Sequence, residues 1–243
     1  MTTTSISLPE TKFVRLLLER ADDALILGHR LSEWCGHAPL LEEELALANI
    51  ALDLIGQARA LYAIAGEETG FDEDQLAYLR DEGQYRNLLL LEQPNGDFAF
   101  TIVRQLLYST FIDAWWRATV SASDARLAAV AEKAVKESAY HVRHAGEWLV
   151  RLGDGTAESH AHAQAALDQA WRFTGEMFAP DLQAFRPEWD AAIDAILARA
   201  TLTRPSDTIG MRTGGRAGRH SEHLGRLLTE LQYLQRVHPG ASW

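Results

Sequence analysis

The stretch from Glu33 to Gly66 constrains the fold more than any other part of the chain, because it predicts one long amphipathic helix. A short connection (36–39) leads into three consecutive glutamates (42–44), and acidic residues in a first turn suit the positive end of a helix dipole. Gly66 is placed as the helix stop, after apolar residues that recur at helical spacing: Leu45, Ile50, Leu54, Leu61 and Ile64.

Helical periodicity also marks most of the remaining chain, and no strand period of two persists anywhere. Long helices are predicted over 11–34, 97–120 and 125–152, and further helices over 72–82, 156–178, 188–200 and 221–237. Four long helices in two antiparallel hairpins, joined by a long crossover (67–96), are typical of ferritin-like bundles. We therefore predict an all-α protein: a ferritin-like four-helix bundle core with additional C-terminal helices, forming a single domain over residues 1–243.

Composition argues against several classes of partner and compartment. A formal net charge of -11 and a pI of about 5.3 disfavour binding to nucleic acid or anionic membranes. The single cysteine, Cys35, leaves no possible internal disulfide. The first residues lack the features of a signal peptide, and no apolar window reaches the length of a bilayer span. We expect a cytoplasmic protein with no nucleic-acid partner and no membrane association.

A row of polar residues on the central helix raises the question of a metal site. Asn49, Asp53 and Gln57 stand four residues apart, so they line up along one side of the helix. On the predicted helix over 125–152, Glu137 and His141 share a face in the same way. The row could be a metal site, the remnant of one, or an internal hydrogen-bond network.

The spacing of these residues argues against an intact di-iron centre. Such a bundle takes one Glu from each of two helices and a Glu-x-x-His pair from each of the other two. In this chain the residue three positions after Asp53 is Gly56, and the residue three positions after Glu137 is Tyr140, so neither acid has the histidine that the motif requires. The favoured interpretation is a vestigial polar cluster of Asp53, Glu137 and His141 that satisfies its own hydrogen bonds. A mononuclear or zinc site built from Glu137, His141 and His144 remains as an alternative.

Long sequence motifs run through the chain from about Leu16 to Trp243. They are EWCGHAPLLEEELALANIALDLIGQARALY, RDEGQYRNLLLLEQPNGDFAFTIVRQ, KESAYHVRHAGEWLVRLGDGT, WRFTGEMF, RTGGRAGRHSEHLG and LQYLQRVHPGASW. With these motifs the chain resembles the PaaC subunits of the bacterial phenylacetyl-CoA epoxidases, also called ring 1,2-phenylacetyl-CoA monooxygenases. The resemblance covers nearly the whole chain, and its motifs are long and specific.

The resemblance implies a ferritin-like subunit that has lost its di-iron site and carries no cofactor of its own. It implies a homologous catalytic partner, PaaA, that holds the di-iron site and epoxidises the ring of phenylacetyl-CoA. A small PaaB subunit, and a flavin and iron-sulfur reductase that delivers electrons from NADPH, complete the implied complex. It also implies a contact with the CoA thioester through the stretch that matches here, Gln84, Tyr85, Arg86 and Asn87.

Three functional hypotheses follow. The first is a non-catalytic, structural subunit of a multicomponent oxygenase in phenylacetate catabolism, with Leu88, Leu90 and Trp116 as candidate partner contacts. The second is an autonomous metal-dependent oxidase. The third is a CoA-thioester binding protein that has no oxygenase partner. Metal analysis of the chain and co-purification with a second ferritin-like chain would discriminate between them.

Overall fold

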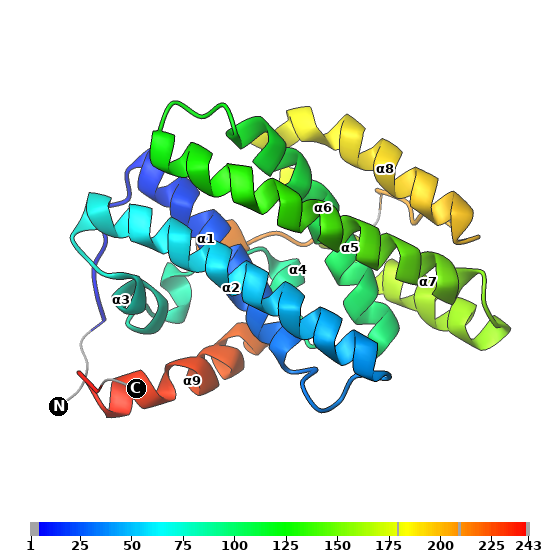
Figure 1. Cartoon of the computed structure of the whole chain (residues 1–243), viewed down its shortest axis with the longest axis horizontal. Coiled ribbons are helices and arrows are strands. Elements are labelled where there is room, and N and C mark those ends of the chain that lie inside the picture. The colour runs from blue at the N-terminus through cyan, green and yellow to red at the C-terminus, as the bar shows by residue number, and fades with distance from the viewer. Residues whose placement is uncertain (1–4, 179, 209, 242–243) are drawn as a thin grey trace.

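The computed structural model describes residues 5–178, 180–208 and 210–241, and within these ranges it contains helices but no β-strand. Its four long helices are α1 (Lys12–Ser32), α2 (Leu41–Thr69), α5 (Phe98–Thr119) and α6 (Ala125–Gly153). They form two hairpins, α1 with α2 and α5 with α6, which pack against each other (Figure 1). The predicted all-α, ferritin-like bundle is confirmed.

Shorter helices pack around the bundle. They are α3 (Glu73–Tyr78), α4 (Leu89–Glu92), α7 (Ala157–Trp171), α8 (Arg186–Arg199) and α9 (Glu222–Val237). Short 3₁₀ turns lie at Glu82–Gln84, Thr174–Phe178, Pro180–Phe185 and Gly215–Ala217. Helices α7 and α8 pack on the α5–α6 hairpin, whereas α9 runs beside α3 and α4 (Figure 1). None of the described helices is both long and apolar enough to cross a membrane.

The structure corrects three predicted helix ends. The helix predicted over 72–82 ends earlier, at Tyr78. Gly66 does not end α2, which continues to Thr69 and is capped by Gly70 in a left-handed conformation. Gly66 instead allows a close approach, because a Cβ there would lie 2.3 Å from the carbonyl oxygen of Phe71. The predicted helix over 156–178 ends at Trp171, after which the chain continues as a 3₁₀ turn.

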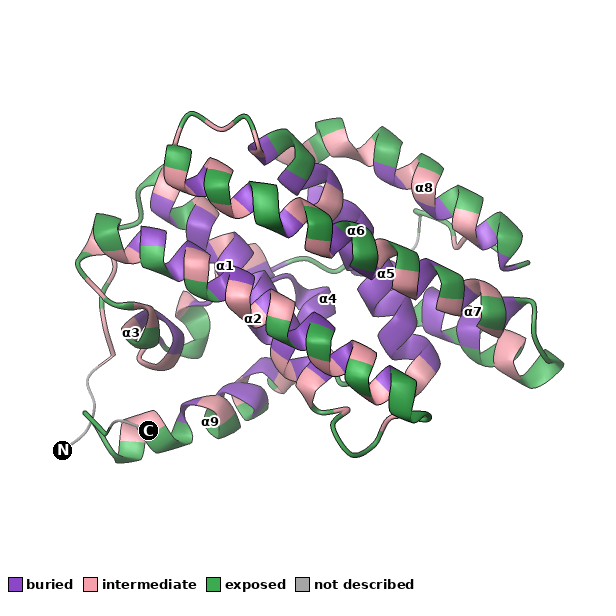
Figure 2. Cartoon of the chain, viewed as in Figure 1, coloured by how far each residue is buried: buried purple, intermediate pink, exposed green. Residues whose placement is uncertain are grey.

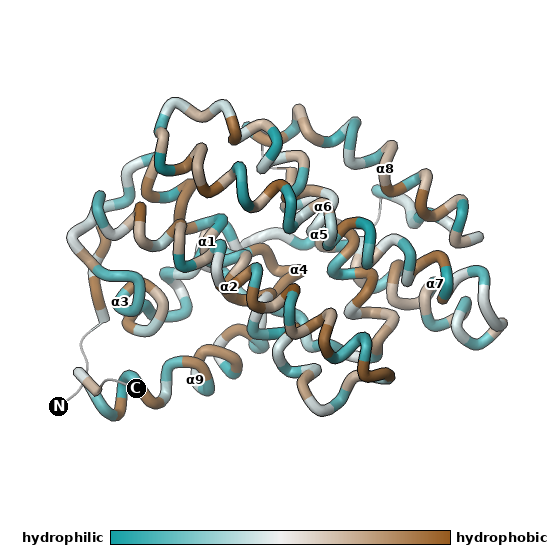
Figure 3. The backbone as a smooth tube through the Cα atoms, in the orientation of Figure 1, coloured by the Kyte–Doolittle hydropathy of each residue, from teal (hydrophilic) through white to brown (hydrophobic). Residues whose placement is uncertain are grey.

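Burial differs sharply between the long helices. Figure 2 shows α5 buried on nearly all sides, because α6, α7 and α8 surround it. Figure 3 shows the crossover at α4 as a hydrophobic stretch. Leu88 and Leu90 in this stretch are fully buried, as is Trp116 on α5, so the prediction that these three residues contact a partner is wrong. The apolar run over 88–91 is core because the bundle and α9 close over it.

The predicted buried face of α2 is also wrong at Leu45. Its side chain is 58% exposed, and Leu41 and Leu52 on the same face are exposed too. These three residues lie four and seven positions apart, so they form a stripe on the outer side of α2. Helical spacing identified an apolar stripe but not which stripe the bundle buries.

Candidate functional site

Two histidine–carboxylate pairs connect α2 and α6. His141 Nε2 lies 3.1 Å from Asp53 Oδ2, and His144 Nε2 lies 2.9 Å from Glu43 Oε2. The side chain of His141 is buried, whereas that of Asp53 keeps 35% of its exposure. Each imidazole therefore faces a single carboxylate.

The remaining polar residues of this region bond elsewhere. Glu137 accepts a hydrogen bond from the Gln57 amide at 2.9 Å and forms an ion pair with Lys133 at 3.2 Å. Asn49 is exposed and donates to the Leu45 carbonyl of its own helix at 2.8 Å. The structure thus brings Asp53 and His141 together, while Glu137 hydrogen-bonds to neither.

This arrangement does not fit a di-iron centre. Among the described residues, no three His, Cys, Asp or Glu side chains come close enough together to hold one metal ion. Gly56 supplies no ligand atom, and Tyr140 is 38% exposed and packs edge-on against the His141 ring. A carboxylate-bridged pair of irons needs several carboxylates converging with two imidazoles, which isolated pairs do not provide. The absence of metal from the purified chain stays a prediction.

The stretch predicted to contact CoA lies in the crossover between the hairpins, next to α1. All four side chains hydrogen-bond within the chain: Gln84 to Ile6 O at 2.6 Å, Tyr85 to Ala77 O, Arg86 to Glu10 Oε1 at 2.6 Å, and Asn87 to Glu92 Oε2 at 3.1 Å. Burial raises the pKa of the Tyr85 hydroxyl to about 12, so this group stays a neutral donor. A contact between this stretch and CoA stays a prediction.

A buried ion-pair network, which sequence reasoning missed, holds the crossover against α1. Its first centre is Asp22, which is fully buried. Asp22 accepts hydrogen bonds from the Arg80 guanidinium at 3.0 Å, the Tyr62 hydroxyl at 2.5 Å and the Arg86 backbone N–H at 2.7 Å. Burial alone would lower the pKa of Arg80, but the Asp22 carboxylate outweighs this effect and raises it. Arg80 therefore stays charged inside the protein.

The neighbouring carboxylate, Asp23, is the second centre. It accepts two hydrogen bonds from Arg216, at 2.6 and 2.9 Å, one from Arg20 at 3.2 Å and one from the Leu88 backbone N–H at 2.9 Å. Burial raises the pKa of the Asp23 carboxyl, and the two arginines offset only part of this shift. Asp23 thereby joins α1, the crossover and the loop over 211–220.

Two further carboxylates fasten the same loop. Both ring nitrogens of His220 face acceptors, because Nδ1 lies 2.9 Å from Glu92 Oε2 and Nε2 lies 3.0 Å from the Tyr85 carbonyl. Burial lowers the pKa of His220, but the hydrogen bond and the charge of Glu92, together with the Tyr85 carbonyl, outweigh burial and raise it. Glu176 accepts the backbone N–H of Gly214 at 2.7 Å. The crossover and the loop are thus held rigidly on α1.

Comparison with known proteins decides the family. The whole sequence, residues 1–243, matches the family model described as phenylacetic acid catabolic protein. The chain belongs to the phenylacetic acid catabolic protein family. It is 49% identical over 245 aligned residues to the C-type subunit of the 1,2-phenylacetyl-CoA epoxidase of Escherichia coli strain K12. The alignment covers 93% of this chain and 97% of that relative, so the resemblance found in the sequence is confirmed.

Membership of the phenylacetic acid catabolic family places the chain in phenylacetate catabolism. In this family member the two polar regions differ in character. The carboxylate of the Asp53–His141 pair is partly open to solvent, whereas both carboxylates of the other region, Asp22 and Asp23, are fully buried. Paired groups of this kind can hold charge and fix helices, but neither region combines a free nucleophile with a base.

Proposed function

We propose that this chain is a non-catalytic C-type subunit of a phenylacetyl-CoA epoxidase, and that it supports a separate di-iron catalytic subunit. The observation that carries the proposal is 49% identity, over nearly the full length of both proteins, to the C-type subunit of the Escherichia coli epoxidase. The implied partners are a PaaA-like catalytic subunit, a small PaaB-like subunit and a reductase.

The geometry between α2 and α6 supports the non-catalytic part of the proposal. Asp53 and Glu43 each face one histidine, and Glu137 bonds to an amide and a lysine. Such pairs satisfy buried polar groups, which is a structural task. Oxygen activation is therefore assigned to the partner subunit.

The buried ion-pair network supports the scaffold role. Asp22 and Asp23 tie the crossover and the loop over 211–220 to α1, so both segments are fastened to the bundle. A rigid second bundle can restrain the helices of a catalytic bundle and hold its metal ligands in position. Stable pairings of this kind bury about 2,000 Å² or more.

Reconstitution tests the proposal. Phenylacetyl-CoA epoxidation is measured with the catalytic subunit, the small subunit, the reductase and this chain, omitting each in turn. We expect turnover to require this chain, and the variants Asp53→Ala, Glu137→Ala and His141→Ala to keep turnover per assembled complex. Full turnover in the mixture that lacks this chain would refute the supporting role. Turnover by this chain without the catalytic subunit would indicate an autonomous oxidase. Loss of turnover in a variant that still folds and assembles would refute the non-catalytic assignment.

Co-purification separates the remaining rival. A CoA-thioester binding protein without an oxygenase partner should purify alone and bind the thioester. A C-type subunit should instead co-purify with the catalytic subunit. Failure of the two chains to associate when co-expressed would contradict the proposal.

A further inference from the structure

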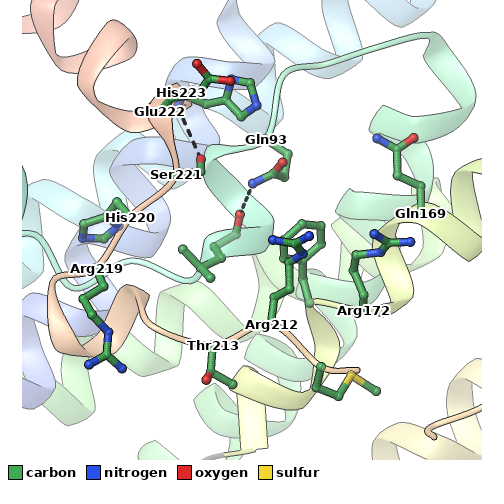
Figure 4. A pocket seen from close by; sticks show the side chains of 13 residues that line it. Gln93, Gln169, Arg172, Arg212, Thr213, Arg219, His220, Ser221, Glu222 and His223 are labelled. Carbon is green, nitrogen blue, oxygen red and sulfur yellow. Dashed lines mark hydrogen bonds between the residues drawn. The ribbon is translucent and has the colours of Figure 1, made fainter. Parts of the chain in front are cut away.

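A cavity of about 690 Å³ lies between α4, the end of α7 and the segment over 211–223. Its size falls within the range of about 300–1,000 Å³ typical of small-molecule sites. Three arginines line it, Arg172, Arg212 and Arg219, and Figure 4 shows them around the hollow together with Gln93 and Gln169. In a chain with a net charge of -11, such a concentration of positive charge is unexpected.

These three arginines lack the partners that the other arginines of the chain have. Across the described ranges, the arginine side chains that make no ion pair, hydrogen bond or ring contact are Arg172, Arg199, Arg212 and Arg219. The Nε atom of Arg172 is buried and has no hydrogen-bond partner. Guanidinium groups offer five N–H donors each, so the cavity holds many unused donors.

The local backbone holds two of these arginines together. The backbone N–H of Arg212 donates to the carbonyl of Arg172 at 2.8 Å, and Figure 4 shows both side chains among those around the hollow. The one carboxylate in the lining is Glu222, which is exposed and pairs with Arg226 at 3.1 Å. Arginine stays positively charged in proteins, so an anion in the cavity would supply the counter-charge that these side chains lack.

The rest of the lining suits a ligand with an organic body. Leu89, Phe173 and Met211 supply apolar surface beside the arginines. Arginine pairs bind phosphate through parallel N–H bonds, in a geometry that a single lysine cannot reproduce. The chemistry of the cavity therefore favours a phosphate ester or diphosphate over a purely apolar ligand.

We propose that this cavity binds the phosphate group of a small molecule through Arg172 and Arg212, with Arg219 adding positive charge at its edge. Inorganic phosphate, a nucleotide and a CoA ester share this chemistry. The site does not depend on the proposed function of the chain, although a CoA ester would link the two. None of these three arginines belongs to the stretch over 84–87 that was predicted to contact CoA.

Calorimetric titration of the purified full chain tests the proposal. The probes are inorganic phosphate, pyrophosphate, ADP and CoA, each at low ionic strength, because salt screens such contacts. We expect at least one probe to bind, and Arg212→Gln and Arg172→Gln each to raise its Kd about tenfold or more, as charge-assisted bonds are lost. Arg199→Gln is the matched control, since Arg199 is exposed, has no partner and lies outside the cavity. It should leave the Kd unchanged.

The pattern across the probes identifies the source of the phosphate. Tighter binding of CoA than of ADP indicates a CoA ester, and equal binding indicates a nucleotide or pyrophosphate end. Binding of inorganic phosphate alone indicates the free ion. Each result supports a phosphate site, provided that the two arginine variants weaken it. Thermal unfolding checks that the variants fold; if Arg172→Gln does not, Arg212→Gln decides, because the Arg212 side chain is exposed and unpaired.

Two results would overturn the proposal. One is the absence of binding for all four probes, and the other is an unchanged Kd in the arginine variants. If no probe binds but Arg212→Gln weakens association with the catalytic subunit, the arginines hold an acidic segment of a partner instead. These titrations use the chain alone and the reconstitution assay uses the whole complex, so either proposal can fail without the other.

Discussion

Replacing Asp22 by alanine should lower the free energy of unfolding by about 3–5 kcal/mol, because it leaves the Arg80 charge buried without its partner. Both side chains are fully buried. The carboxylate also accepts the Tyr62 hydroxyl at 2.5 Å and the Arg86 backbone N–H at 2.7 Å. Loss of those two bonds costs about 1 kcal/mol each, which is consistent with the upper part of the range.

Asp53→Ala is the matched control for this prediction. It removes the same kind of side chain, an aspartate paired with one other side chain, His141, but Asp53 is 35% exposed. Water can replace the lost contact, so we expect a change of about 1 kcal/mol or less. The difference between the two variants isolates the effect of burial.

Urea unfolding at neutral pH, followed by far-ultraviolet circular dichroism, measures both variants. The two variants can be compared if, in each, the unfolding free energy falls with urea concentration at the same slope as in the wild type. If Asp22→Ala destabilises the chain no more than Asp53→Ala, the buried network does not hold the crossover on α1 and the rigidity argument fails.

Two other predictions concern a histidine and two glycines. Because the folded pKa of His220 is raised above 6.5, the stability from its bond with Glu92 is complete below that pH and is lost as pH rises through the folded pKa. His220→Asn should therefore destabilise the chain more at about pH 5.5 than at about pH 9 in urea unfolding, and an equal effect at both would contradict this. Gly56→Ala should stabilise α2 by up to about 1 kcal/mol, since a Cβ there meets nothing within 4 Å. Gly66→Ala should destabilise it despite the same gain in helix propensity, because its Cβ would meet Phe71 O at 2.3 Å; thermal unfolding of both variants measures the sign.

The helical architecture could be predicted because it depends on local periodicity. Helices α5 and α6 begin and end within about two residues of their predicted bounds, and both are capped by an aspartate, Asp97 and Asp124. The end of α2 could not be predicted, because Gly66 is required by the contact with Phe71 rather than by a helix stop. Tertiary contacts of this kind leave no signal in the spacing of residues along the sequence.

The buried network escaped prediction for a similar reason. Asp22 and Asp23 are adjacent acids directly before an apolar run (24–27), which is the one available signal for buried partners. Their partners lie 58 and 193 residues away, at Arg80 and Arg216, and no sequence spacing selects these arginines from the others. The histidine positions of the di-iron motif, in contrast, follow helical spacing, so Gly56 and Tyr140 could be identified directly.

The central claim is that this bundle keeps the ferritin-like fold without the ligands for a pair of irons. The most direct measurement is the iron content of the chain, expressed by itself in iron-replete medium and purified without chelator. We expect iron well below one ion per chain, with no change in Glu137→Ala. A stoichiometric pair of irons that Glu137→Ala abolishes would contradict it.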